Sequence, residues 1–189
     1  MTDTPMNQAM NPTKPSNANT SGMLRLFVYG TLKRGFWNHD RFCRGVLTVE
    51  DAVVHGRLFE TSSGIPFLEV PDEDVIAIGT TNPLADVATQ AHVAARMSNP
   101  EPTPDRLPKK GTGAPWGPVY GELLTFDDPE NRLPAIDRLE GFHPGGPCLY
   151  RRVLVPVRAN GTGLPVWLYV ADVNEYLGFK PLPSGKWRS

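Results

Sequence analysis

The sequence of 189 residues lacks several features that mark common classes of protein. Its two cysteines, Cys43 and Cys148, are too few for a disulfide framework and too few and too widely spaced for a zinc site. Its formal net charge is -1, whereas nucleic-acid and anionic-membrane binding require clustered positive charge. No apolar run is long enough to span a bilayer, and the first residues do not resemble a signal peptide. We therefore expect a soluble cytoplasmic protein that binds a small molecule, and neither nucleic acid nor a membrane.

The residues that are present predict one domain between two tails. Residues 1–22 are rich in Asn, Thr, Pro and Ser and have almost no large apolar side chains, which predicts a disordered tail. Residues 23–177 are enough for one domain with a full core. Residues 178–189 form a second tail with two prolines and Trp187, which we expect to cover part of the sheet or a partner.

Within the domain, the patterns predict more strand than helix. Strands are predicted over residues 25–29, 66–70, 75–78, 119–126, 151–158 and 166–170, and the Asn160-Gly161 pair predicts a hairpin between the last two. Residues 46–49 and 52–59 are either two strands or one bent strand with a bulge at Gly56. A short helix capped by Asn38 is predicted through residues 40–43, and another helix over residues 84–97. Pro134 would break a longer helix, so we expect a turn at residues 128–131 and a helix from about residue 134 to Leu139, ended by Gly141. These elements fit a mixed sheet curled into a small barrel, an α+β fold.

The end of the first predicted strand is a candidate anion site. Residues 25–29 form an apolar run that stops at Gly30 and Thr31. Glycine lets a ligand approach the main chain closely, and the threonine adds a hydroxyl donor. Two or three amide groups that converge there would bind a carboxylate without a lysine or arginine. The alternative is an ordinary exit from a strand into a turn.

Two stretches of the sequence, more than a hundred residues apart, resemble the motifs of one family. The first is Val28-Tyr29-Gly30-Thr31-Leu32-Lys33-Arg34-Gly35, followed by Asn38-His39. The second is Ile136-Asp137-Arg138-Leu139-Glu140-Gly141-Phe142, followed by Tyr150-Arg151-Arg152-Val153-Leu154-Val155-Pro156-Val157. Both resemble the γ-glutamylcyclotransferase-like (AIG2-like) family, especially its γ-glutamylamine cyclotransferase branch. The resemblance covers about residues 26–172, except for a segment at about residues 80–115 that we interpret as an insertion.

This resemblance implies a fold, a reaction and a set of site residues. The fold is a small mixed β-barrel with peripheral short helices and a cavity at one end. In the reaction, the α-amine of a γ-glutamyl amine attacks its own γ-carbonyl, so that 5-oxoproline forms and an amine leaves, with no metal or cofactor. The glutamate of the acidic motif is the catalytic carboxylate, which makes Glu140 the general base and acid. The loop formed by Tyr29, Gly30, Thr31 and Leu32 would hold the α-carboxylate or the developing oxyanion.

The environment predicted for Glu140 suits that role. A glutamate at a helix C-terminus faces the negative end of the helix dipole, and burial beside Leu139 and Phe142 would disfavour its charge, so both effects raise its pKa. The alternative is an exposed glutamate at a helix end. Asp137 and Glu122 compete for the role of base, but neither occupies the acidic position of the family motif.

Other residues have two interpretations each. Tyr150 and Arg152 point to the same face of a strand, and Tyr150 either lends its hydroxyl to the site or is a core aromatic bonded to the backbone. His39 is more typical of a capping or packing residue than of a catalyst, and Cys43 has no base beside it in the sequence and is interpreted as a packed thiol.

The function has an alternative of another class. A non-catalytic module would use the same cavity to bind a small carboxylate or a peptide terminus, with residues 99–118, rich in proline and glycine, as an interaction surface. The sequence favours no particular leaving amine and no particular oligomeric state.

Overall fold

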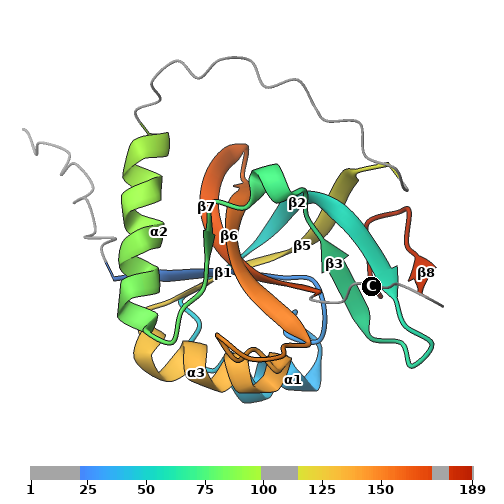
Figure 1. Cartoon of the computed structure of the whole chain (residues 1–189), viewed down its shortest axis with the longest axis horizontal. Helices are drawn as coiled ribbons and strands as arrows, with labels where there is room; N and C mark the ends of the chain where they lie inside the picture. The colour runs from blue at the N-terminus through green and yellow to red at the C-terminus, as the bar shows by residue number, and fades with distance from the viewer. Residues whose placement is uncertain (1–21, 99–114, 172–178, 189) are drawn as a thin grey trace, which may run out of the picture.

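The computed structural model describes residues 22–98, 115–171 and 179–188, arranged as in Figure 1. The strands are β1 (Leu24–Val28), β2 (Thr48–Glu60), β3 (Pro66–Glu69), β4 (Ala77–Ile78), β5 (Gly117–Phe126), β6 (Tyr150–Ala159), β7 (Thr162–Ala171) and β8 (Lys180–Pro181). The helices are α1 (Trp37–Phe42), α2 (Pro83–Met97) and α3 (Pro129–Glu140), with a 3-10 turn at Asp72–Asp74. The predicted tail at residues 1–22, apart from Gly22, and most of residues 99–118 lie outside the described residues.

Five strands close into a barrel in the order β2, β5, β1, β7 and β6, because β6 pairs back onto β2. All of these pairings are antiparallel except that of β1 with β7, so the sheet is mixed. The helices lie outside the barrel, with α2 along one flank and α1 and α3 together at one end (Figure 1). The predicted α+β fold, a small mixed barrel with peripheral short helices, is confirmed.

Strand β2 is one continuous strand, although the sequence allowed either two strands or one bent strand with a bulge at Gly56. It is thirteen residues long and pairs with β5, β6, β3 and β8 at successive positions. A Cβ atom on Gly56 would lie 2.5 Å from the Glu69 carbonyl oxygen of β3. The glycine at this position therefore lets two strands approach closely, and it is not the centre of a bulge.

The core has two parts, which alternate along the strands. Leu26 and Trp167 belong to the part between the barrel wall and the helices, whereas Phe27 and Leu168 belong to the part that fills the barrel. This alternation follows from the two-residue period of a strand. It also directs Tyr29, at the end of β1, to the same side as Phe27.

Helix α3 differs from the prediction, because it runs continuously from Pro129 to Glu140 with Pro134 inside it. Arg132 holds the first turn of α3 in place. Its guanidinium pairs with Asp128 at 2.9 Å and donates to the backbone carbonyls of Phe42 and Arg44, at and after the end of α1. Leu133 and Ile136, on either side of the proline, are fully buried. These contacts outweigh the one helical hydrogen bond that a proline removes. Gly141 ends the helix in the left-handed conformation, as predicted.

The other local predictions had mixed outcomes. Helix α2 was predicted correctly, and the side chain of Asn82 caps it. The hairpin between β6 and β7 was also predicted, and its turn residues Asn160 and Gly161 both have positive φ angles. Asn38 does not cap α1, because Phe36 holds the cap position and Asn38 lies buried in the first turn. No helix among the described residues is long and apolar enough to cross a bilayer.

Residues 180–188, which we call the strap, return to the barrel. Strand β8 pairs with β2, and the Leu182 amide donates to the Leu58 carbonyl at 2.8 Å. Farther along, the Tyr120 amide donates to the Gly185 carbonyl, also at 2.8 Å. The strap therefore covers part of the sheet and ends with Trp187 buried against the barrel.

Candidate functional site

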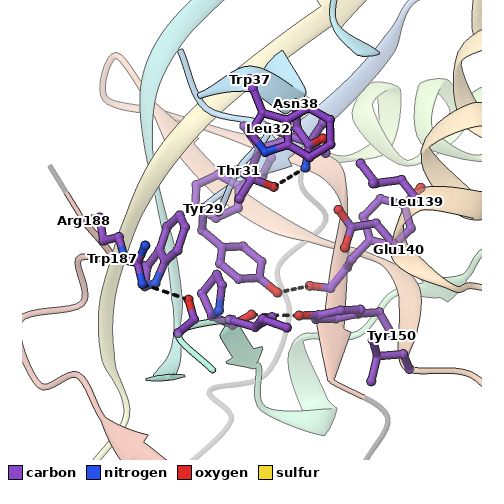
Figure 2. Close-up of a pocket in the computed structure, with 18 of the residues that line it drawn as sticks. Tyr29, Thr31, Leu32, Trp37, Asn38, Leu139, Glu140, Tyr150, Trp187 and Arg188 are labelled. Carbon is purple, nitrogen blue, oxygen red and sulfur yellow. Dashed lines mark hydrogen bonds between the residues drawn. The ribbon is translucent and has the colours of Figure 1, made fainter. Parts of the chain in front are cut away.

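A cavity of about 360 Å³ opens where β1 ends. The loop after β1, the start of α1, the end of α3, the start of β6, residues 63–66 and the strap enclose it (Figure 2). Residues far apart in the sequence therefore meet in one pocket. The six site residues predicted from the sequence, Tyr29, Gly30, Thr31, Leu32, Glu140 and Tyr150, all line it.

The loop after β1 has the features of an anion cradle. The Lys33 amide donates to the Gly30 carbonyl at 3.1 Å and closes a tight turn. The amides of Gly30, Thr31 and Leu32 form no hydrogen bond with any described residue. Thr31 Oγ1 accepts a hydrogen bond from Asn38 Nδ2 at 2.7 Å, so the hydroxyl proton of Thr31 is left for another acceptor. The loop can therefore offer up to four donors to a carboxylate or an oxyanion.

Glu140 is the last residue of α3, and its carboxyl points into the cavity on the side facing Tyr29 and Thr31 (Figure 2). The side chain is surrounded by protein, and only a part of it is open to the pocket. Burial raises its pKa to about 7, and the negative charge of Asp137 contributes to the rise. Its carboxyl forms no hydrogen bond with a described residue. A carboxyl with these properties can both accept and donate a proton near neutral pH.

The hydroxyl groups of the two tyrosines of the site both donate to backbone carbonyls. The hydroxyl of Tyr150 donates to the Pro66 carbonyl at 2.9 Å, and the hydroxyl of Tyr29 donates to the Tyr169 carbonyl at 2.9 Å. Burial raises the pKa of Tyr150 above its ordinary value, so this hydroxyl keeps its proton. The interpretation of Tyr150 as a buried aromatic bonded to the backbone is confirmed, and the residue also lines the cavity. Its oxygen remains able to accept a hydrogen bond from a ligand.

The acids that competed with Glu140 are not in the cavity wall. Asp137 lies behind it, paired with Arg152 at 3.0 Å and bonded by the Tyr169 hydroxyl at 2.7 Å. Glu122 pairs with Arg34 at 2.8 Å on another part of the surface. Among the described acids, Glu140 alone lines this cavity.

His39 and Cys43 also lie outside the lining of the cavity. The His39 ring donates from Nδ1 to the Leu32 carbonyl at 2.8 Å, so it supports the anion loop from behind. Cys43 is buried in the core, and burial raises the pKa of its thiol to about 12, which leaves it unreactive at neutral pH. Both placements agree with a structural role.

Sequence reasoning missed the contribution of the strap. Trp187 is only 3% exposed and lines the cavity together with Arg188. The indole Nε1 donates to Glu60 at 2.9 Å, and the ring stacks on Phe36 with 5.4 Å between centroids. A tryptophan in an otherwise polar tail was the only sequence signal for this wall.

Asn38 was also misjudged, since it braces Thr31 and does not cap a helix. The motif that contains Asn38 gave its position but no hint of this partner. Among the described residues, no three or more His, Cys, Asp or Glu side chains are grouped so that they could hold a metal ion.

Solved structures that align with the chain share little sequence with it. YkqA from Bacillus subtilis is 21% identical with a TM-score of 0.47, over 87% of this chain and 39% of that one, so the present chain spans well under half of YkqA. An AIG2-like protein from Mus musculus is 20% identical with a TM-score of 0.46, over 82% of each chain. An uncharacterized protein from Pyrococcus horikoshii is 17% identical with a TM-score of 0.46, over 87% and 89%.

A search of curated proteins gives no match. The profile of the family described as "Gamma-glutamyl cyclotransferase, AIG2-like" matches residues 26–86 and 84–189, which together include both sequence motifs, the barrel and the strap. The chain therefore belongs to the AIG2-like γ-glutamyl cyclotransferase family.

Proposed function

We propose that the protein is a γ-glutamyl cyclotransferase that converts a γ-glutamyl amine into 5-oxoproline and a free amine. One observation carries the proposal. The carboxyl of Glu140, with its pKa near neutrality, points into the same cavity that Thr31 and the amides of the β1 loop line. Membership of the family supports cyclotransferase-type activity.

The reaction begins with proton transfer to Glu140. In its ionised form Glu140 takes a proton from the α-ammonium of the γ-glutamyl group, and the amine nitrogen so formed attacks the γ-carbonyl carbon. A carbon–nitrogen bond forms and the carbonyl π electrons move to oxygen, which gives a tetrahedral oxyanion. When this intermediate collapses, the bond to the leaving nitrogen breaks and Glu140 returns its proton to that nitrogen. The new ring nitrogen loses its second proton as well, which Glu140 takes and passes to the departing amine, so that the amine leaves as its ammonium ion. The glutamate therefore ends each turnover in the state in which it began.

The protein needs no covalent nucleophile in this scheme, because the substrate carries its own. Intramolecular attack in a well-oriented substrate has an effective molarity of roughly 10⁵ to 10⁸ M, so orientation is a large part of the task. The donors of the β1 loop hold either the α-carboxylate or the developing oxyanion. The oxygen of Tyr150 lies in the same wall and accepts a hydrogen bond from the substrate amine.

We further propose that the substrates are γ-glutamyl amines, as in the γ-glutamylamine cyclotransferase branch that the β1 loop and the acidic motif resemble. The test is a panel of γ-glutamyl amines that includes γ-glutamyl amino acids, the isopeptide with the lysine side chain and γ-glutamyl polyamines. 5-Oxoproline is measured by mass spectrometry, with Glu140→Gln as the matched control. We expect 5-oxoproline from at least one substrate with the native protein and none above background with the variant.

A different result would support the binding module. Retention of 5-oxoproline by the protein, without product from any member of the panel, would overturn the enzymatic proposal. Glu140 argues against a site that only binds anions, because its ionised side chain would repel a bound carboxylate.

A further inference from the structure

A buried ion cluster lies behind the part of the cavity wall that carries Glu140. We call Asp86, Asp137 and Arg152 the Arg152 cluster. Arg152 on β6 is fully buried, and its Nη1 lies 3.0 Å from Asp86 on α2 while its Nε lies 3.0 Å from Asp137 on α3. Its Nη2 donates to the Thr80 carbonyl at 2.9 Å. The guanidinium therefore joins the barrel to two helices.

The cluster holds two acids against one base, so it has one excess negative charge when all three groups are ionised. Burial raises the pKa of Asp137, and the charge of Arg152 and the hydroxyl of Tyr169 oppose that rise. Without Arg152, a carboxyl at this depth would take up a proton. Asp86 fixes Arg152 in turn and is itself held by the amide and hydroxyl of Thr80. Arg152 and Tyr169 thus favour the ionised form of Asp137, against the larger effect of burial on its pKa.

That charge lies one helical turn from Glu140. Residues three apart on a helix are neighbours on its surface, with about 5–6 Å between their Cβ atoms. The charge of Asp137 accordingly contributes to the raised pKa of Glu140. Several titratable side chains line the cavity together with Glu140, namely Tyr29 after β1, Tyr150 on β6, Tyr169 on β7 and Arg188 on the strap. Other charged or titratable groups on the elements that form the site lie outside the lining, including Asp137 and Arg138 on α3, Arg152 on β6, His39 on α1 and Asp86 on α2.

Building on the proposed function, we propose that Asp137 is a positioning residue for the reaction, and that Arg152, anchored from α2 by Asp86, holds it ionised. The charge on Asp137 adds to the effect of burial in keeping a proton available on Glu140 at neutral pH, although Asp137 itself does not line the cavity. Glu140 can then serve first as base and then as acid in one turnover. Helix α2 comes from the segment interpreted as an insertion, and it thereby acts on the chemistry of the cavity through Asp86.

The test is a pH titration of Glu140 that is monitored by carbon-13 NMR in protein labelled at its glutamate side-chain carboxyls. The signal of Glu140 is assigned as the one that is missing in Glu140→Gln. In Asp137→Asn we expect the midpoint of the Glu140 titration to fall by about one to two pH units, given the spacing and an effective dielectric of about 20 to 40. Asp137→Glu keeps the charge and should restore the native midpoint. Glu130→Gln, an exposed charge change in the first turn of the same helix, is the control and should leave the midpoint in place. An unmoved midpoint in Asp137→Asn would overturn the inference.

A second variant is needed in case Asp137→Asn does not fold, because that substitution removes one partner of a buried guanidinium. Tyr169→Phe leaves all three charges in place and removes only the hydrogen bond to Asp137. With the aspartate side-chain carboxyls labelled as well, the midpoint of the Asp137 titration should rise, and that of Glu140 should fall by a smaller amount than in Asp137→Asn. A Glu140 midpoint that stays fixed while that of Asp137 rises would count against the inference.

Activity separates this inference from the proposed function. The acid limb of the pH profile of kcat/KM should move with the Glu140 titration in each variant. Titrations that shift as expected in a protein that forms no 5-oxoproline would overturn the proposed function while supporting the electrostatic role of the cluster. An active enzyme whose profile and titration do not respond to Asp137→Asn would overturn that role instead.

Discussion

The two walls of the cavity are built in opposite ways. The wall formed by the end of α3 carries Glu140 and is backed by the Arg152 cluster, so its chemistry depends on charges shielded from water. The strap wall, opposite it in Figure 2, presents Trp187 and Arg188. It is held by backbone hydrogen bonds to the barrel, by hydrogen bonds from the Lys33 ammonium and to Glu60, and by ring stacking. Under the proposed function this difference predicts a division of labour, in which the α3 wall transfers protons and the strap wall shapes the space for the substrate.

The strongest test of this division is Glu140→Gln. The substitution keeps the shape of the side chain and removes its acid–base function, so kcat should fall at least about 100-fold while KM changes by a few-fold at most. Steady-state kinetics on the best substrate of the panel measure both constants, and circular dichroism checks the fold. A native kcat with a raised KM would show that the α3 wall only binds the substrate, and the two walls would then not differ in role.

The same variant should also be more stable than the native protein at high pH. The pKa of Glu140 is about 7 in the fold against an ordinary value of 4.5, so the ionised form is the one that folding disfavours. The contribution of this group to stability is complete below pH 4.5 and is lost as the pH rises through 7. Glu140→Gln, which stays neutral, should therefore gain up to about 3 kcal/mol at pH 8 and little at pH 4.5. Urea unfolding at both values measures the gain, and an equal effect at the two would contradict the raised pKa.

Between the two walls, the anion loop should show an intermediate effect. Thr31→Val removes the hydroxyl that Asn38 braces, with little change of volume. Loss of one hydrogen bond to a charged group is worth about 1.5–3 kcal/mol, so kcat/KM should fall at least about tenfold. Thr48→Val, at an exposed position on β2, is the matched control. Equal kinetics in the two variants would show that the hydroxyl of Thr31 does not contact the substrate.

The strap should give the smallest effect, and mainly on binding. Trp187→Leu keeps an apolar side chain against Phe36 but opens the cavity wall, so KM should rise several-fold with kcat nearly unchanged. Trp116→Leu, which alters a tryptophan outside this cavity, is the control. A large fall in kcat for Trp187→Leu would mean that the strap takes part in orienting the reacting groups, and the division between the walls would fail.

Local sequence signals predicted one wall of the site better than the other. The apolar strand that stops at Gly30 and the helix that stops at Gly141 are local patterns, and they correctly predict that the loop after β1 and Glu140 lie at element ends. The barrel also followed, because strand signals and the Asn160 turn are local.

The remainder depends on contacts between residues distant in the sequence. The continuity of α3 through Pro134 rests on Arg132 reaching toward α1, and Arg152 finds its two acids on separate helices. Trp187 joins the cavity only because β8 pairs with β2. None of these contacts produces a periodic pattern in the sequence, so neither residue propensity nor the spacing of residues predicts them.

Lys33 fastens the strap to the anion loop. Three residues after Gly30, its ammonium donates to the carbonyls of Trp187 and Arg188 at 2.8 and 3.0 Å. Any shift of the strap away from the barrel pulls on the backbone that carries the amides of Gly30 to Leu32. Under the proposed function, the strap wall of the cavity and the loop that would receive the negative charge of the substrate are therefore mechanically coupled, and widening the cavity at the strap would also displace the amides of that loop.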